Sequence, residues 1–498
     1  MSFAKLEDLG RKLEALEHAQ SMLSVDEAVQ MPVGGGEKRA EAMAMLAGLF
    51  HELAAAPEIA GWIDAAENEA RDATQAASVR EFRRFYENLT CLSADFVRRQ
   101  VNARVRCEQL WRELRPTGNW SSFLPAFEGV IALMREEAEL RAAASGLAPY
   151  DAMMEQYDPG NRVADIAPVF AELKTFLKGF VPEAIAHQEE KLKKRPLKPF
   201  NAPFPIDRQK ALGHAMMEAL GFDFDHGRLD ISHHPFCGGV PSDVRMTTRY
   251  VTAEFLSSLM GIVHETGHGL YEQGLPKQWA HMPLGRARGM AMHESQSLFV
   301  EMQLARSPEF WEWAMPVVTQ HLGAEALAGW DIEDMLTHIH RIRPGLIRVD
   351  ADEATYPLHV ILRFEIEQEL VSGRLAPRDI PEIWDAKMKE YLGLSTIDDA
   401  KDGPMQDVHW PSSAFGYFPS YTQGALIAAQ LRAALEKAQP AARDDIRNGR
   451  FVALNDWRRE HIWSQASLWS TPELLERATG EKLQARYFTE HLKRRYLA

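Results

Sequence analysis

Residues 259–271 read LMGIVHETGHGLY, with His264 and His268 four positions apart and Glu265 directly after the first histidine. Apolar residues flank this HExxH pattern on both sides, which predicts a helix from Ala253 to about Tyr271. At 3.6 residues per turn, positions i and i+4 lie about 40° apart around the axis, so both imidazoles project from one face. They can hold the same Zn²⁺, and Glu265, about 100° from His264, is placed to meet a water on that metal.

A catalytic zinc takes three protein ligands and keeps one open position, and the sequence offers three candidates for the third ligand. Glu294 follows His268 by 26 residues, on the next predicted helix. Because its neighbours over residues 290–302 are largely apolar, a carboxylate there is expected to point into a site. His281 and His293 are rival ligands, ranked below Glu294 because a histidine at either place is more often a core residue or a support for a ligand.

Most of the remaining sequence shows helical periodicity, with apolar residues at spacings of three and four, as over residues 166–180. Proline and glycine interrupt the pattern at 31–36, 157–160 and 196–205, and no repeat or low-complexity run is present. Residues 227–252 contain glycines and then a run rich in β-branched and aromatic residues, which predicts a short sheet just before the HExxH helix.

These patterns predict a mainly α fold, a large helical bundle with a deep active-site groove and a small β-sheet next to the HExxH helix. We expect a single domain over residues 1–498. Within it, residues 1–200 are expected to form a helical region along one wall of the groove. Residues 201–498 are expected to hold the metal site.

Composition excludes several classes of partner and site. The chain has 498 residues, 56 Lys and Arg against 71 Asp and Glu, and a formal net charge of −15, so nucleic acid and anionic membrane surfaces are poor partners. The N-terminus lacks the apolar segment of a signal peptide and no run reaches 18 apolar residues, which favours a cytoplasmic location. The three cysteines, Cys91, Cys107 and Cys237, are scattered and indicate reduced thiols, so a metal must find other ligands.

Six sequence blocks together resemble the carboxypeptidase Taq type metallocarboxypeptidases, a family of helical zinc peptidases. Their order and spacing match from about residue 31 to the C-terminus. Val25 and Gln423 depart from the residues usual in that family, at positions expected to affect packing or pocket lining. The blocks are HPF at 234–236, DVRMT at 243–247, HETGH at 264–268, HESQ at 293–296, IRVDAD at 347–352, and HW at 409–410 followed by GYFPSYTQG at 416–424.

The resemblance implies a metal-dependent carboxypeptidase that releases single amino acids from peptide C-termini, and a homodimer. It assigns the metal to His264, His268 and Glu294, in agreement with the spacing argument, and makes Glu265 the general base toward a metal-bound water. The ion is expected to be Zn²⁺, with Co²⁺ or Mn²⁺ as possible substitutes. The alternatives are a related zinc oligopeptidase or dipeptidyl carboxypeptidase and, outside the enzymes, a helical scaffold with a vestigial metal site.

A carboxypeptidase must recognise a free α-carboxylate, and arginine does so best because its planar fork donates two parallel hydrogen bonds. Arg348 is the first candidate and Arg245 the second. The alternative role for each is an internal ion pair, with Asp350 or Asp352 for Arg348 and with Asp243 for Arg245.

Aromatic and histidine residues complete the predicted site. Tyr421 is expected to donate to the oxyanion, with His409 and Tyr417 as further candidates, and Tyr417 is also expected to contact substrate. His234 and residues 244–250 are expected at the edge of the cleft, where an unpaired strand would hold an extended peptide. Asp352 and Glu353 are candidates for orienting a ligating histidine.

Overall fold

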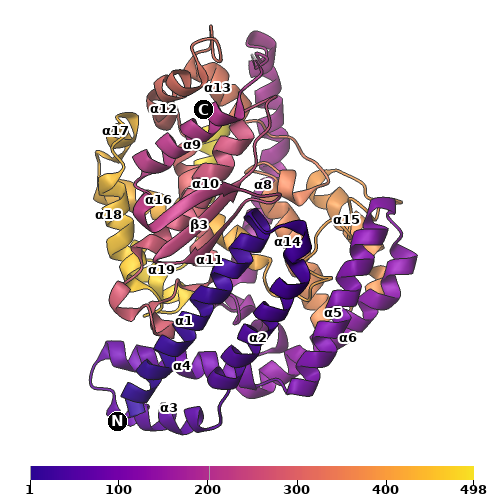
Figure 1. Cartoon of the computed structure of the whole chain (residues 1–498). Helices are drawn as coiled ribbons and strands as arrows, with labels where there is room; N and C mark the ends of the chain where they lie inside the picture. Colours follow the sequence, from indigo (N-terminus) through magenta and orange to yellow (C-terminus); the bar gives the residue numbers. More distant parts are fainter. Residues whose placement is uncertain (1, 201, 498) are drawn as a thin grey trace.

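Helix α10 (Leu256–Gly274) lies in the middle of the molecule in the computed structural model, which describes residues 2–200 and 202–497 (Figure 1). One side of this helix packs against strand β3 (Asp243–Thr248), and another packs against helix α11 (Gly289–Leu298). Helix α11 is covered in turn by α16 (Pro419–Ala438). The HExxH helix is therefore an interior element with neighbours that fix its position.

Two glycines allow helix α11 to approach both of its neighbours closely. A Cβ at Gly267 on α10 would lie 2.3 Å from the carbonyl oxygen of Gln296. A Cβ at Gly424 on α16 would lie 2.7 Å from Cγ of Glu294. Because only glycine fits at such distances, α11 can place Glu294 directly against the HExxH helix.

The sheet contains β1 (Gly227–Ile231), β2 (Phe236–Val240) and β3, in the order β1-β3-β2. Strand β1 is parallel to β3 and β2 is antiparallel to it. The predicted small sheet beside the HExxH helix is thus confirmed. The expectation that residues 244–250 offer an unpaired strand edge was wrong, because β3 is the central strand and is paired on both sides.

The remaining helices form the bundle, and the mainly α prediction is confirmed. Helix α10 begins at Leu256, three residues later than predicted, because Val251 and Glu254 form an isolated bridge before it. No helix within residues 2–200 and 202–497 is long and apolar enough to span a bilayer. The other helices are α1 (Ser2–Val29), α2 (Gly36–Ala54), α3 (Glu58–Glu69), α4 (Ala73–Thr90), α5 (Ala94–Leu114), α6 (Trp120–Ser145), α7 (Pro149–Met154), α8 (Val163–Lys194), α9 (Ile206–Leu220), α12 (Pro308–Leu322), α13 (Ile332–Ile339), α14 (Tyr356–Val371), α15 (Ile380–Leu392), α17 (Ala442–Arg447), α18 (Val452–His461), α19 (Thr471–Thr479) and α20 (Ala485–Tyr496), with a π-helical segment η6 (Phe299–Ala305) after α11.

Hydrophobic packing divides into two clusters. The larger one runs through the sheet, α10, α11 and the helices around them. The smaller one joins α1, α3 and α4, at the N-terminal end of the chain in Figure 1, through residues such as Leu6, Ile63 and Phe82. Met282 and Leu284, just before α11, complete this second cluster and tie the N-terminal helices to the centre of the fold.

A groove of about 1100 Å³ is lined by residues of α10, α11 and α16 among others. Its lining residues lie between Phe200 and Tyr421 in the sequence. Phe200 belongs to the predicted wall of residues 1–200, and that wall stays a prediction. Val25 and Gln423, the two departures from the family pattern, are buried and lie outside the lining.

Candidate active site

His264, His268 and Glu294 converge at one point of the groove, which we call the metal end together with Glu265. One ligand atom from each of the three residues lies within 4.8 Å of the others. Oε2 of Glu294 is 3.4 Å from Nε2 of His268 and 3.9 Å from Nε2 of His264. Two imidazole nitrogens and a carboxylate oxygen are the donor set of many catalytic zinc sites.

The imidazole of His264 is oriented by a carboxylate behind it. Its Nδ1 lies 2.9 Å from Oε2 of Glu301, whose other oxygen accepts a hydrogen bond from Arg306 at 2.7 Å. Burial disfavours the charged ring, but the bond to Glu301 and the charges of Glu294 and Glu265 outweigh it and raise the pKa of His264 to about 10. Metal binding would displace that proton from Nε2 while Nδ1–H still donates to Glu301.

The second imidazole is held by a different chain of groups. Nδ1 of His268 is 2.6 Å from Nδ1 of His293, and Nε2 of His293 is 2.7 Å from Oε1 of Glu272. Because the carboxylate of Glu272 can only accept, His293 donates to it from Nε2 and accepts at Nδ1 from His268. Burial lowers the pKa of His268 to about 4. The ring is neutral, carries its proton on Nδ1 and presents the lone pair of Nε2 toward Glu294.

Glu265 lines the groove beside the three converging residues, with 8% of its surface exposed. Burial raises the pKa of its carboxyl to about 7, against the opposing charge of His264. Its side chain has no hydrogen-bond partner among the described contacts of the groove, so its carboxylate is available to a bound water or substrate.

Arg348 also lines the groove, and we call this part of the lining, together with Tyr356, Tyr417 and Tyr421, the arginine end. Its guanidinium donates to Oδ1 of Asp407 at 2.8 and 3.1 Å and to the hydroxyl of Tyr356 at 3.0 Å. The ion-pair partner is thus Asp407, and neither Asp350 nor Asp352 takes that place.

Asp407 is shared between two buried arginines. Its Oδ2 accepts from Nε of Arg363 at 2.8 Å, while Oδ1 faces Arg348. Burial alone would raise the pKa of Asp407, but the charges of Arg363 and Arg348 hold it well below its usual range. Asp407 is thus a single carboxylate hydrogen-bonded to two guanidinium groups.

Tyr421 connects the arginine to the rest of the aromatic lining. Its ring lies 4.9 Å from the guanidinium of Arg348 and 5.2 Å from the ring of Tyr417. His409 lies behind it, outside the groove lining, with Nε2 at 3.2 Å from the Tyr421 hydroxyl. Burial lowers the pKa of His409 to about 4, so this imidazole is neutral and its contact is with Tyr421.

Two predicted substrate contacts lie away from this arrangement. Arg245 forms a two-pronged ion pair with Asp243, including an Nη2–Oδ2 distance of 2.7 Å, and is absent from the groove lining. The backbone carbonyl of His234 accepts from Ser232, and its neighbours Pro235 and Phe236 line the groove in its place.

Comparison with known proteins agrees with this geometry. The model of the carboxypeptidase Taq (M32) metallopeptidase family matches residues 5–496. The chain belongs to that family. It is 37% identical to thermostable carboxypeptidase 1 of Thermus thermophilus, over 100% of this chain and 98% of the relative, and 31% identical to carboxypeptidase 1 of Bacillus subtilis, over 98% and 97%. The solved structure of Trypanosoma cruzi metallocarboxypeptidase 1 has a TM-score of 0.95 at 39% identity, covering 100% of this chain and 99% of that one.

Membership of the M32 family establishes the enzyme class. The chain is a metal-dependent carboxypeptidase, a hydrolase of peptide bonds, as the resemblance implied. The helical fold with a small sheet is that of M32 carboxypeptidase structures.

Several residues of this M32 site escaped the sequence argument. Glu301 orients His264, in the role that we expected of Asp352 or Glu353. Glu272 lies four residues after His268, a helical spacing that places both on one face and could have been noticed. Asp407 gave no comparable signal, because it reaches Arg348 and Arg363 across 59 and 44 positions of sequence.

Proposed function

We propose that His264, His268 and Glu294 hold a zinc ion, that Glu265 is the general base, and that the enzyme removes single residues from peptides with a free C-terminus. The observation that carries the proposal is the convergence of two Nε2 atoms and one carboxylate oxygen in a groove that Arg348 also lines. Cobalt or manganese would also fit this donor set.

The side chains around the ligands suit a divalent cation. Both imidazoles have their Nδ1 atoms engaged, by Glu301 and by His293, so each can turn only its Nε2 to an ion. A divalent ion held by such a set supplies a Lewis acid and lowers the pKa of water. Burial raises the pKa of Glu294, but the neighbouring imidazoles of His268 and His264 outweigh this and lower it, so Glu294 would be an anionic ligand.

Glu265 would perform the proton transfers. It follows His264 on the same helix and borders the groove, so its carboxylate can accept a proton from the attacking water. The same carboxyl group can then donate that proton to the nitrogen of the departing amino acid. Its burial keeps bulk water from competing for this proton.

The arginine end would select substrates with a free C-terminus. A terminal carboxylate would accept charge-assisted hydrogen bonds from Arg348, which lines the groove. Tyr421, whose hydroxyl is held by His409, is proposed as the donor to the oxyanion, with Tyr417 packed against its ring as a substrate contact. Arg245 and His234 remain weaker candidates for substrate binding. A cytoplasmic homodimer remains a prediction from the sequence and the family resemblance.

The test is hydrolysis of an N-blocked dipeptide or tripeptide by the zinc-loaded protein. A copy of the substrate with an amidated C-terminus and the variant Glu265→Gln are run beside it. We expect release of the terminal amino acid, loss of cleavage with the amide, and a roughly 10²- to 10⁴-fold lower kcat in the variant.

The other outcomes distinguish the alternatives. Cleavage that survives amidation would replace the single-residue carboxypeptidase by an oligopeptidase. Release of dipeptides would indicate a dipeptidyl carboxypeptidase. Full activity of Glu265→Gln would remove the proposed base.

A further inference from the structure

The segment η6, directly after α11, is π-helical and carries the carboxylate that orients His264. π-Helical turns are rare and occur mostly at functional sites. Glu301 lies 2.9 Å from Nδ1 of His264 and pairs at 2.7 Å with Arg306, five residues further along the chain. In an α-helix, residues five apart lie about 140° apart around the axis, whereas the wider π turn brings them toward one side. The π-helical form of η6 thus favours the pairing that holds Glu301.

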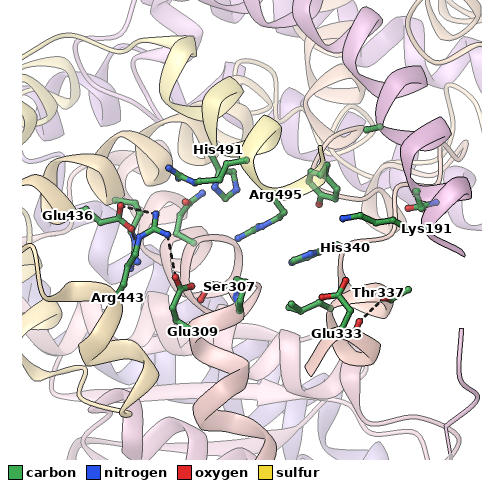
Figure 2. Close-up of a pocket in the computed structure, with 18 of the residues that line it drawn as sticks. Lys191, Ser307, Glu309, Glu333, Thr337, His340, Glu436, Arg443, His491 and Arg495 are labelled. Atoms are coloured by element: carbon green, nitrogen blue, oxygen red, sulfur yellow. Dashed lines mark hydrogen bonds and ion pairs between the residues drawn. The ribbon is translucent and has the colours of Figure 1, made fainter. Parts of the chain in front are cut away.

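Two side chains from other parts of the fold hold the end of η6. Nη2 of Arg495, on α20, donates to the carbonyl oxygen of Met302 at 2.8 Å. His340, directly after α13, donates from Nε2 to the carbonyl oxygen of Arg306 at 2.6 Å. Both side chains line a cavity of about 310 Å³ beside η6 (Figure 2). Because the last carbonyl groups of a helix lack intrahelical donors, donors from outside help to decide where its last turn lies.

Arg495 reaches η6 from a fixed position. Its side chain is 7% exposed, and its Nη1 donates to Oε2 of Glu353 at 2.7 Å. The carboxylate of Glu353 is also bonded to Nε2 of His491 at 2.6 Å and to the hydroxyl of Tyr496 at 3.1 Å, both on α20. One buried carboxylate therefore fixes three side chains of the C-terminal helix, and Arg495 connects that helix to η6.

Given the proposed role of His264 as a zinc ligand, we propose that Arg495 is a positioning residue for the metal site. Its bond to Met302 lies one residue from Glu301, so a shift of η6 at Met302 moves the carboxylate that orients the ring of His264. The loss of such a support typically weakens metal binding about 10- to 100-fold. Arg495 itself lines the cavity beside η6 and is absent from the groove lining, so it acts on the metal only through η6.

The alternative role for Arg495 is that of an anchor for α20 alone. The ion pair with Glu353 would serve that role without the bond to Met302. Zinc affinity separates the two roles. The loss of a mere anchor lowers the free energy of unfolding but leaves the zinc affinity of the folded protein unchanged.

The test is the zinc affinity of the full chain, measured by competition with a chromophoric chelator, for the wild type, Arg495→Gln and Arg494→Gln. Arg494 is the matched control, because it is the neighbouring arginine on α20 and its guanidinium makes no hydrogen bond or ion pair with residues 2–200 or 202–497. We expect roughly ten-fold weaker zinc binding in Arg495→Gln and no change in Arg494→Gln. Circular dichroism and urea unfolding establish that each variant is folded.

A double variant tests the route through Glu301. Arg495→Gln should weaken zinc binding in the wild type but cause no further loss in Glu301→Gln, because the carboxylate that it positions is then absent. His340→Leu removes the other donor to η6 and leaves Glu353 paired. This variant should show the same pattern, and it replaces Arg495→Gln if that protein does not fold.

Unchanged zinc affinity in the folded variant would overturn the proposal and leave Arg495 as an anchor of α20. Equal losses with and without the Glu301 carboxylate would also overturn it, because Arg495 would then act by another route. A wild type that binds no zinc would contradict the proposed function itself, and this result is distinct from a loss that is confined to the variants.

Discussion

At the metal end of the groove the ligands come from two adjoining helices, α10 and α11, and each imidazole has one partner behind it. At the arginine end, Arg348, Arg363, Asp407 and Tyr421 come from four separate segments of the chain. Local helix geometry fixes the first arrangement, whereas the second exists only when distant segments are folded together. The two ends should therefore respond differently to substitution, the metal end through metal affinity and the arginine end through stability and substrate binding.

Asp407→Asn should give the largest change in stability. Arg348 and Arg363 are 5% and 1% exposed, and the variant removes the carboxylate that they share. Breaking a buried ion pair lowers the free energy of unfolding by about 3–5 kcal/mol. Urea unfolding of the wild type and the variant measures the difference. Glu369→Gln, in an exposed pair with Arg374, is the control and should cost at most about 1 kcal/mol. Equal losses in both variants would mean that the arginine end does not depend on Asp407.

Asp158 links α11, the helix of Glu294, to α16, the helix of Tyr421, and its protonation makes the strength of this link depend on pH. Its Oδ1 accepts from the backbone N–H of Ala291 on α11 at 2.8 Å, and its Oδ2 from Ser420 on α16 at 2.6 Å. Burial raises the pKa of Asp158 from 3.8 to about 6. Since the folded pKa lies above the unfolded one, its contribution to stability is complete below about pH 4 and is lost as pH rises through 6.

Asp158→Asn should remove that pH dependence. The amide oxygen can accept from Ala291, its NH₂ can donate to the Ser420 hydroxyl, and it has no proton to lose, so the variant should gain about 2–3 kcal/mol over the wild type between pH 4 and pH 8. Unfolding free energies at several pH values test this. A difference that stays constant with pH would show that Asp158 is charged throughout, and a difference that grows as pH falls would reverse the argument.

These contrasts also explain how far the sequence could predict the site. Local sequence patterns, the spacing of His264 and His268 and the apolar residues around Glu294, predicted these three residues as metal ligands. Their side chains do converge in the structure. The helical class and the small sheet follow from periodicity. Contacts between distant segments leave no local pattern in the sequence. Two features depend on such contacts: β3 is paired on both sides, and Arg348 pairs with Asp407 in place of Asp350 or Asp352.

Arg348→Gln tests substrate recognition at the arginine end. Loss of charged hydrogen bonds to a terminal carboxylate should lower kcat/KM roughly 10- to 100-fold, mainly through a higher KM, with the metal content unchanged. Steady-state kinetics and metal analysis of the purified variant measure both effects. Arg245→Gln is the matched comparison and should stay close to wild type, because that guanidinium is paired with Asp243 outside the groove. If Arg245→Gln lowered kcat/KM more than Arg348→Gln, Arg245 would replace Arg348 as the proposed residue that binds the terminal carboxylate.

Glu301→Gln and Glu272→Gln compare the supports of the two imidazoles. Glu301 contacts His264 directly at 2.9 Å, so its replacement should weaken metal binding about 10- to 100-fold, as measured by competition with a chromophoric chelator. Glu272 acts on His268 only through His293, and His293 keeps its contact with His268 when Glu272 is changed. We therefore expect less than a ten-fold loss for Glu272→Gln. Equal losses of metal affinity in the two variants would contradict this. They would mean that Glu272, acting through His293, supports His268 as strongly as Glu301 supports His264 by direct contact.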